Sequence, residues 1–282
     1  MITVLESLNL STDFLEKKGI ESPRLNAQLL LAEILNCKKL DLYLKFDRPL
    51  SEEETEKYRS WVLRRSKFEP LQYIIGKVEF YGLPFKVTPD VLIPRPETEI
   101  LVEEVINFCK NKKSIRILDI GTGSGNIPVA LAKNMNGADI TAIDISEKAI
   151  TIAKENANVN SVENKINFIT ADVNSFSVND KFDCVISNPP YVSKEEFQTL
   201  QQEIKDYEPR IAVTDSNDGL DFYRVIAAQS KKLLKPGGKI FLEVGKDQSG
   251  FVKQLFEQNG FINVQCVKDL PQIERVVSGE LK

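Results

Sequence analysis

The chain has 282 residues, of which 42% are hydrophobic, and this size allows one large domain or two smaller ones. Its 37 basic and 41 acidic residues give a formal net charge of −4, which argues against a broad nucleic-acid-binding face because such a face needs many cations. The chain contains no histidine, so a Ser-His-Asp triad, a histidine general base and a histidine-rich metal site are excluded.

Residues 1–76 are predicted to form a small helical domain. Apolar residues recur at helical spacing after Ile2, and Gly19 can end that first helix. Ser22 and Pro23 supply an N-cap and a first-turn proline for a second helix. The stretch "SEEE" at Ser51–Glu54 has the form of a capping box and predicts the start of a third helix.

The pattern then changes to that of a β-hairpin. Residues 77–87, "KVEFYGLPFKV", alternate apolar and polar side chains around Gly82. We therefore expect a hairpin linker over residues 77–90, followed by a second domain over residues 91–282.

The second domain is predicted to alternate helices and strands. Its expected strands are, in chain order, "IRILDI", "TAIDI", "INFIT", "FDCVIS", "KIFLEV" and "INVQCV". Helical stretches separate the strands, which indicates a parallel sheet covered on both faces. Ligands of such folds bind at the C-terminal ends of the strands, so the residues that follow the strands are the candidates for a functional site.

A glycine-rich loop, "GTGSGN", follows the first of these strands. Gly121, Gly123 and Gly125 permit a tight turn and a close approach of backbone N–H groups to a ligand. The spacing is GxGxG preceded by Asp119, which is neither the dinucleotide fingerprint GxGxxG nor a nucleotide-triphosphate P-loop. The alternative interpretation is an ordinary turn between a strand and a helix.

Acidic residues end the next two strands. Asp144 stands where a carboxylate can accept hydrogen bonds from two ribose hydroxyls. It can instead cap the following helix, although Ser146 is available for that purpose. Asp172 and Val173 end the third strand, where they are expected to meet the edge and the face of an adenine ring.

The stretch "SNPPYV" follows the fourth strand and places an amide, two prolines and an aromatic ring together. Pro189 and Pro190 stiffen the backbone, and the alternative is that they only end a loop. A planar NH2 group is a poor nucleophile, because its lone pair is delocalised. The Asn188 side-chain oxygen and the Pro189 carbonyl can bind the two hydrogens of such a group, and Tyr191 can pack against its plane.

These features resemble the class I S-adenosylmethionine-dependent methyltransferases, which share D-x-G-x-G-x-G and an acid after the second strand. The resemblance implies a Rossmann-like α/β fold with a seven-stranded sheet and S-adenosylmethionine as the cofactor. The (D/N)PP(Y/F) motif of such enzymes acts on planar amino groups, and Asn188 to Tyr191 match it as the expected catalytic residues. The expected cofactor-binding residues are Asp119, Gly121, Thr122, Gly123, Ser124, Gly125, Asp144, Asp172, Val173 and Asn188.

A closer resemblance covers nearly the whole chain. The stretches "SPRLNAQLLLAEIL", "EPLQYIIG", "FYGLPFKV", "VLIPRPETE", "YEPRIAV", "DGLDFYR", "LKPGG" and "ERVV" occur in the order typical of the HemK/PrmC family, the peptide chain release factor N5-glutamine methyltransferases. The resemblance implies that the helical domain recognises class 1 release factors. It also implies that the substrate is the glutamine of their GGQ motif.

Two positions depart from the family pattern, and the roles of three others stay open. Asn26 stands where the family usually has Asp, and Val173 where some relatives carry an aromatic residue. The segment "IPRPETE" is expected to line the substrate entrance. Its charged residues can serve the substrate, the cofactor or only a helix start; they are Arg95, Glu97 and Glu99.

Two other functions remain as alternatives. The first is an N6-adenine DNA or RNA methyltransferase with the same chemistry at the NPPY motif, which would need to unstack a base and bind phosphates. Residues 1–85 contain 13 basic and 13 acidic residues, so the recognition domain is neutral, and direct nucleic-acid binding is not expected. The second is a cofactor-sensing scaffold, which would predict damage to the NPPY motif or the glycine loop, and both are intact.

The chain is expected to be cytoplasmic and to have no membrane partner. No uninterrupted apolar run of about 18 residues occurs, and the first 20 residues are amphipathic and acidic. The four cysteines are too far apart for a CxxC motif, so they are expected to be buried structural thiols in a reducing compartment. No metal site is predicted.

Overall fold

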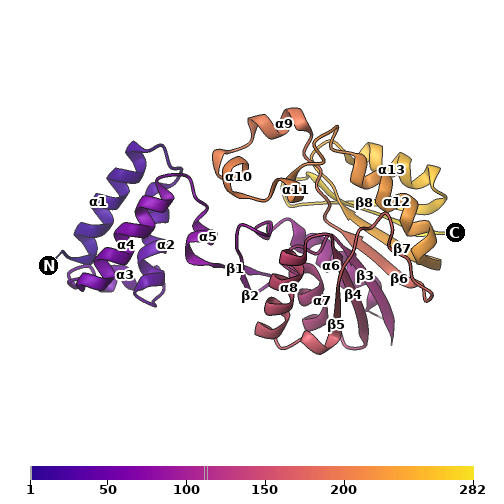
Figure 1. Cartoon of the computed structure of the whole chain (residues 1–282), viewed down its shortest axis with the longest axis horizontal. Helices are drawn as coiled ribbons and strands as arrows, with labels where there is room; N and C mark the ends of the chain where they lie inside the picture. Colours follow the sequence, from indigo (N-terminus) through magenta and orange to yellow (C-terminus); the bar gives the residue numbers. More distant parts are fainter. Residues whose placement is uncertain (1, 111, 113) are drawn as a thin grey trace. The chain divides into compact units, whose positions relative to one another are not determined.

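The computed structural model describes residues 2–110, 112 and 114–282, which form two compact units (Figure 1). The first unit comprises the chain through Gly76 together with Gln201–Tyr207. The second comprises Lys77–Leu200 and Glu208–Lys282. The residues of the predicted hairpin fall within the second unit.

The first unit is helical, as its apolar periodicity indicates. Its N-terminal part contains α1 (Val4–Lys17), α2 (Pro23–Ile34), α3 (Asp41–Leu44), α4 (Glu52–Arg65) and α5 (Leu71–Ile75). The helices enclose a core in which Leu15, Leu30 and Leu31 are fully buried. Burial of each such side chain contributes roughly 1.5–3 kcal/mol. The Tyr58 hydroxyl donates a hydrogen bond to the Ala27 carbonyl at 3.1 Å, which joins α4 to α2.

The predicted helix starts are confirmed with one correction. Ser51 and Glu54 form the expected capping box at the start of α4, and Thr3 and Glu6 form another at the start of α1. Ser22 occupies the N-cap position of α2, but it has a left-handed backbone and makes no capping hydrogen bond through its side chain. The Asn26 side chain donates to the Ser22 carbonyl instead, at 3.1 Å.

A short helix from later in the chain completes the first unit. This helix, α10 (Gln202–Tyr207), follows the NPPY motif in sequence. Arg65 of α4, which is 6% exposed, forms an ion pair with Glu203 at 2.7 Å. The Tyr207 hydroxyl donates to the Lys67 carbonyl at 2.8 Å.

The second unit contains the predicted hairpin and a seven-stranded sheet (Figure 1). Strands β1 (Lys77–Phe80) and β2 (Leu83–Lys86) form the hairpin. The large sheet has the strand order β5-β4-β3-β6-β7-β9-β8. Its strands are β3 (Ile115–Ile120), β4 (Ala138–Asp144), β5 (Ile166–Thr170), β6 (Phe182–Ser187), β7 (Leu234–Glu243), β8 (Phe261–Lys268) and β9 (Glu274–Leu281).

The expectation of a parallel sheet is correct for five strands and wrong for the other two. Strands β3 to β7 pair in parallel, whereas β9 pairs antiparallel with both β7 and β8. Only residues 269–273 separate β8 from β9, and so short a connection cannot carry the crossover that parallel pairing requires.

Helices cover both faces of the large sheet. They are α6 (Thr98–Cys109), α7 (Asn126–Asn134), α8 (Glu147–Val159), α12 (Asp221–Leu233) and α13 (Ser249–Gln258). The second unit also contains α9 (Lys194–Thr199), α11 (Arg210–Val213) and a 3-10 turn at Glu163–Lys165. One buried cluster packs α6, α7 and α8 against the sheet, and another packs α12 and α13 against it. The carboxyl ends of β3, β4 and β6 therefore remain at one open edge, where a ligand can bind.

The cysteines form no disulfide bond among the described residues. All four cysteines are free; Cys109 and Cys184 are buried, while Cys37 and Cys266 are half-buried. Over residues 2–110, 112 and 114–282, no helix combines the length and the apolar character that a membrane crossing requires.

Candidate active site

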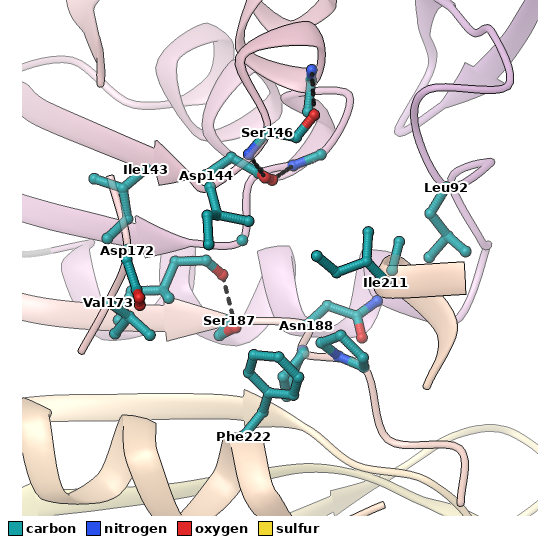
Figure 2. Close-up of a pocket in the computed structure, with 18 of the residues that line it drawn as sticks. Leu92, Ile143, Asp144, Ser146, Asp172, Val173, Ser187, Asn188, Ile211 and Phe222 are labelled. Carbon is teal, nitrogen blue, oxygen red and sulfur yellow. Dashed lines mark hydrogen bonds between the residues drawn. The ribbon is translucent and has the colours of Figure 1, made fainter. Parts of the chain in front are cut away.

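A pocket of about 250 Å³ opens at the carboxyl edge of the large sheet (Figure 2). All of its lining residues belong to the second unit. Of the residues singled out in the sequence, those that line it are Gly121, Gly123, Asp144, Asp172, Val173, Asn188, Pro189 and Pro190. The parallel pairing of β3 with β4 and β6 brings together side chains that are up to 69 positions apart in the chain.

The glycine loop turns tightly between β3 and α7. The backbone N–H groups of Gly121 and Thr122 both donate to the Ile143 carbonyl, at 2.8 and 3.0 Å. Gly121 and Gly123 have φ values of +72° and +53°, and a Cβ atom on either would meet no atom within 4 Å. A Cβ on Gly125 would lie 2.9 Å from the Ala153 Cβ, so Gly125 lets α7 approach α8 closely. Gly121 and Gly123 thus leave open space at the pocket.

Asp144 links this loop to the start of α8 through hydrogen bonds. Its Oδ2 accepts from the Gly123 N–H and its Oδ1 accepts from the Ser146 N–H, both at 2.9 Å. Burial raises the pKa of Asp144, although these backbone hydrogen bonds oppose the effect. Ser146 caps α8, as expected, by accepting from the Ala149 N–H at 3.2 Å. Asp144 is therefore free to face the pocket, where Figure 2 shows it beside Ser146.

Asp119 is fully buried beneath the loop. Neither of its carboxylate oxygens has a hydrogen-bond partner of standard geometry among the described residues. Burial raises the pKa of Asp119 to about 7, the Thr122 side chain opposes this shift, and the negative charge of Asp144 adds to it. Asp119 precedes the loop, and Thr122, Ser124 and Gly125 belong to it; none of the four lines the pocket.

Asp172 and Val173 follow β5 and lie on the same side of the pocket as Asp144 (Figure 2). Asp172 Oδ1 accepts from both the backbone N–H and the side-chain amide of Asn174, at 2.8 and 2.9 Å. Val173 is 8% exposed and packs with the cluster beneath the pocket. Asp172 thus forms a local turn while lining the pocket, and Val173 gives this wall an apolar surface.

The NPPY motif begins at the end of β6. The Ser187 hydroxyl donates to the Ile120 carbonyl at 2.7 Å, which holds the start of the motif against β3. Asn188 Nδ2 donates to Thr98 Oγ1 at 3.1 Å, and no described residue donates to Asn188 Oδ1. Asn188, Pro189 and Pro190 line the pocket, so an amide side chain and a stiffened backbone border it.

Tyr191 does not line the pocket, in contrast to the predicted packing of its ring against a substrate. A Cβ atom on Gly245 would lie 2.9 Å from the Tyr191 ring, so the ring packs against that glycine. The Tyr191 carbonyl accepts from Gln248 Nε2 at 2.8 Å. Burial, followed by the charge of Glu243, raises the pKa of the Tyr191 phenol. Tyr191 thus holds the NPPY motif in place through its contacts with Gly245 and Gln248.

The three charged residues of "IPRPETE" have mainly structural contacts. Arg95 pairs with the buried Glu208 at 2.5 Å. Glu99 accepts from the Tyr81 N–H of the hairpin turn at 2.7 Å. Glu97 precedes α6 and makes no capping bond through its side chain. None of the three lines the pocket.

Several apolar pocket residues were not assigned from the sequence. Leu92, Ile211 and Phe222 also line the pocket, with Ile211 and Phe222 on either side of Asn188 in Figure 2. They lie within "VLIPRPETE", "YEPRIAV" and "DGLDFYR", stretches that carried the family resemblance without individual roles. The sequence carried no signal for them beyond their places in these stretches.

The arrangement defines a class I S-adenosylmethionine-dependent methyltransferase. A model of the methyltransferase small domain matches residues 96–207, and a model of the PrmC N-terminal domain matches residues 6–76. A methyltransferase from Pyrococcus furiosus has a similar fold, with a TM-score of 0.53 and 18% identity over 71% of this chain and 89% of that chain. The hMettl16 catalytic domain, solved with an RNA hairpin, gives a TM-score of 0.54 and 18% identity over 82% of this chain and 83% of its own.

Curated relatives identify the family within this class. The release factor glutamine methyltransferase of Fusobacterium nucleatum is 42% identical over 97% of this chain and 77% of its own length. That of Geobacter sulfurreducens is 39% identical over 99% of this chain and 97% of its own length. The chain belongs to the release factor glutamine methyltransferase family.

S-adenosylmethionine is the cofactor of this class, and the residues present suit it. The cofactor carries a positive sulfonium, and the carboxylates of Asp144 and Asp172 line the pocket. The open space above Gly121 and Gly123 admits a ligand against the backbone, where the side chain of another residue would project. Bound at this edge, the cofactor supplies an electrophilic methyl group.

We expect Asp119→Asn to stabilise the ligand-free protein at alkaline pH. The folded state raises the pKa of Asp119 from 3.8 to about 7, so the buried charge destabilises the fold progressively as the pH rises through that window. The gain from asparagine should be absent below a pH of about 4 and on the order of a few kcal/mol above about 7. Urea unfolding of both proteins across this range measures it, and a gain that did not change with pH would contradict the assignment.

Proposed function

We propose that this chain transfers a methyl group from S-adenosylmethionine to the side-chain nitrogen of the GGQ glutamine in class 1 peptide chain release factors. The observation that supports it most is the presentation of Asn188 and Pro189 at the pocket, with no donor among the described residues on Asn188 Oδ1. The names of the curated relatives support the same substrate. Translation termination in the cytoplasm is the process and place that we propose for this activity.

The chemistry depends on the orientation of the glutamine amide. Asn188 Oδ1 and the Pro189 carbonyl accept hydrogen bonds from its two N–H groups, which hold the nitrogen lone pair toward the methyl group. A carbon–nitrogen bond forms as the carbon–sulfur bond breaks, and the nitrogen releases one proton. Leu92, Ile211 and Phe222 exclude water from this end of the pocket. No histidine base is needed in this scheme.

The cofactor is proposed to lie along the edge of the sheet. We assign its methionine part to the glycine loop, its ribose to Asp144, and its adenine to Asp172 and Val173. The carboxylate of Asp144 can accept from two ribose hydroxyls, because each oxygen retains acceptor capacity beside its one backbone bond. Val173 offers the apolar surface that an adenine face requires.

The helical domain is proposed to recognise the release factor, and no direct nucleic-acid binding is expected. The match of residues 6–76 to the PrmC N-terminal domain supports a shared recognition module. The equal numbers of acidic and basic residues over positions 1–85 do not favour phosphate binding.

The identity of the substrate can be tested by offering the enzyme a release factor or a nucleic acid. Purified protein is incubated with methyl-labelled S-adenosylmethionine and either intact class 1 release factor, DNA or ribosomal RNA. We expect label in the release factor and none in the nucleic acids. Label in adenine, with the release factor unlabelled, would replace this proposal by the N6-adenine alternative.

A further inference from the structure

A buried carboxylate lies behind the NPPY motif. Glu243 ends β7 and is 2% exposed, and Thr98, the first residue of α6, is 1% exposed. Glu243 does not line the pocket, and its Oε2 has no hydrogen-bond partner among the described residues. An incompletely paired buried carboxylate destabilises a fold, so Glu243 is expected to serve a purpose other than stability.

Glu243, Thr98 and Asn188 form one polar cluster. Asn188 Nδ2 donates to Thr98 Oγ1 at 3.1 Å. Burial raises the pKa of Glu243 to about 7, whereas side-chain hydrogen bonding from Thr98 and Asn188 favours its charged form. The positive charge of Arg275 also favours ionisation, and the negative charge of Glu97 opposes it.

The hydrogen-bonding capacities of these groups allow one arrangement of the Asn188 amide. At a pH above the Glu243 pKa of about 7, the ionised carboxylate only accepts hydrogen bonds, so the amide must turn its NH2 end toward Glu243 and Thr98. The Thr98 hydroxyl accepts from that NH2 group and keeps its own hydrogen for Glu243. The opposite rotation would place Asn188 Oδ1 against a carboxylate, with two acceptors facing each other. The observed rotation places Nδ2 on Thr98 and leaves Oδ1 without a donor among the described residues.

We propose that Glu243 is a positioning residue which, together with Thr98, fixes the Asn188 amide so that its oxygen faces the NH2 group of the substrate. This inference rests on the proposed function, because it requires a substrate that presents a planar NH2 group. Glu243 acts through Asn188 and touches neither the substrate nor the cofactor. It also explains why an acidic side chain is tolerated at a buried position beside another acid, Glu97.

Glu243→Gln tests the proposal when it is made both in the wild type and in an Asn188→Asp background. An aspartate at position 188 presents an oxygen to the pocket in either rotation, so it needs no orientation. Its second oxygen would face the ionised Glu243, and the two like charges repel. A glutamine at position 243 removes that repulsion and can donate to the aspartate. The same substitution should therefore have opposite effects in the two backgrounds.

We expect Glu243→Gln to lower kcat by about 10- to 100-fold in the wild type, because the Asn188 amide is no longer held in one rotation. In the Asn188→Asp protein it should raise kcat by at least about threefold at a pH of about 8, where both carboxylates are ionised. Losses of equal size in both backgrounds, or no loss in the wild type, would overturn the proposal. Thr98→Ser should retain the wild-type rate, whereas Thr98→Val should lower it.

A stability measurement keeps the test independent of the substrate. In urea unfolding without ligand, Asn188→Asp should destabilise the protein that retains Glu243 more than the protein that carries Glu243→Gln, and additive effects would overturn the contact. If the wild type methylates no release factor, the proposed function is wrong. The comparison of the single and double variants still shows whether Glu243 contacts residue 188. Asp183→Asn is the matched control, because Asp183 lies at the opposite end of β6. It should combine additively with Asn188→Asp.

Discussion

Asn188→Ala is expected to lower kcat for methyl transfer by at least about a hundredfold at saturating cofactor and substrate. Alanine removes the one side-chain acceptor that the structure presents to the pocket at this position, so the substrate nitrogen loses its orientation. The affinity for S-adenosylmethionine should stay within a few-fold of the wild type, because the glycine loop and Asp144 are unchanged. Single-turnover kinetics and calorimetry measure the two effects separately.

The control for this variant is Asn164→Ala, an exposed asparagine in the 3-10 turn outside the pocket. It should retain the wild-type rate. Near-normal turnover of Asn188→Ala would refute the positioning role of Asn188. A loss of cofactor affinity equal to the loss of rate would instead place Asn188 in the cofactor site alone.

Asp144→Ala should weaken the binding of S-adenosylmethionine by about 10- to 100-fold, since a hydrogen bond to a charged group contributes roughly 1.5–3 kcal/mol. The variant also loses the bonds that Asp144 accepts from the Gly123 and Ser146 N–H groups, so the loop itself should become less ordered. At saturating cofactor, kcat should change little, because Asp144 is assigned no part in transfer. Calorimetric titration measures the affinity.

Two further variants separate ribose binding from loop support. Asp144→Asn keeps one acceptor oxygen and should bind the cofactor with intermediate affinity. Asp139→Ala alters an exposed carboxylate at the amino end of the same strand and should bind normally. Unchanged affinity in Asp144→Ala would count against the ribose assignment.

Local signals in the sequence were sufficient for the main parts of the site. Apolar strands followed by glycine or acidic residues predicted that Gly121, Gly123 and Asp144 would meet, because parallel strands end at a common edge. The capping box at Ser51 depends on residues three apart and was confirmed. These features need only neighbouring residues and the general geometry of a parallel sheet.

Other features depend on contacts that a linear pattern does not contain. The antiparallel β9 follows from a short connection and from its insertion between β7 and β8. The joining of α10 to the first unit depends on the ion pair of Glu203 with Arg65, 138 positions away in the chain. Ser22 occupies the N-cap position of α2. Its backbone is left-handed, however, and its side chain does not form the expected capping hydrogen bond.

The surroundings of Asn188 were the least accessible from the sequence. The ring of Tyr191 packs against Gly245 instead of lining the pocket, because that glycine leaves room for it. Glu243 belongs to the apolar strand "KIFLEV", where an acid at the carboxyl end looks like an ordinary strand terminus. Its proximity to Thr98 and Asn188 results from the packing of α6 beside β6 and β7.

The most direct test of the account is to locate the methyl group on the product by fragmentation mass spectrometry. Intact class 1 release factor is treated with the wild-type protein or with Asn188→Ala in the presence of S-adenosylmethionine. We expect the wild type to add the mass of one methyl group in place of one hydrogen, on the side-chain nitrogen of the GGQ glutamine, and the variant to add almost none. A methyl group on another residue, or an unmodified release factor with methylated adenine in nucleic-acid controls, would contradict the account.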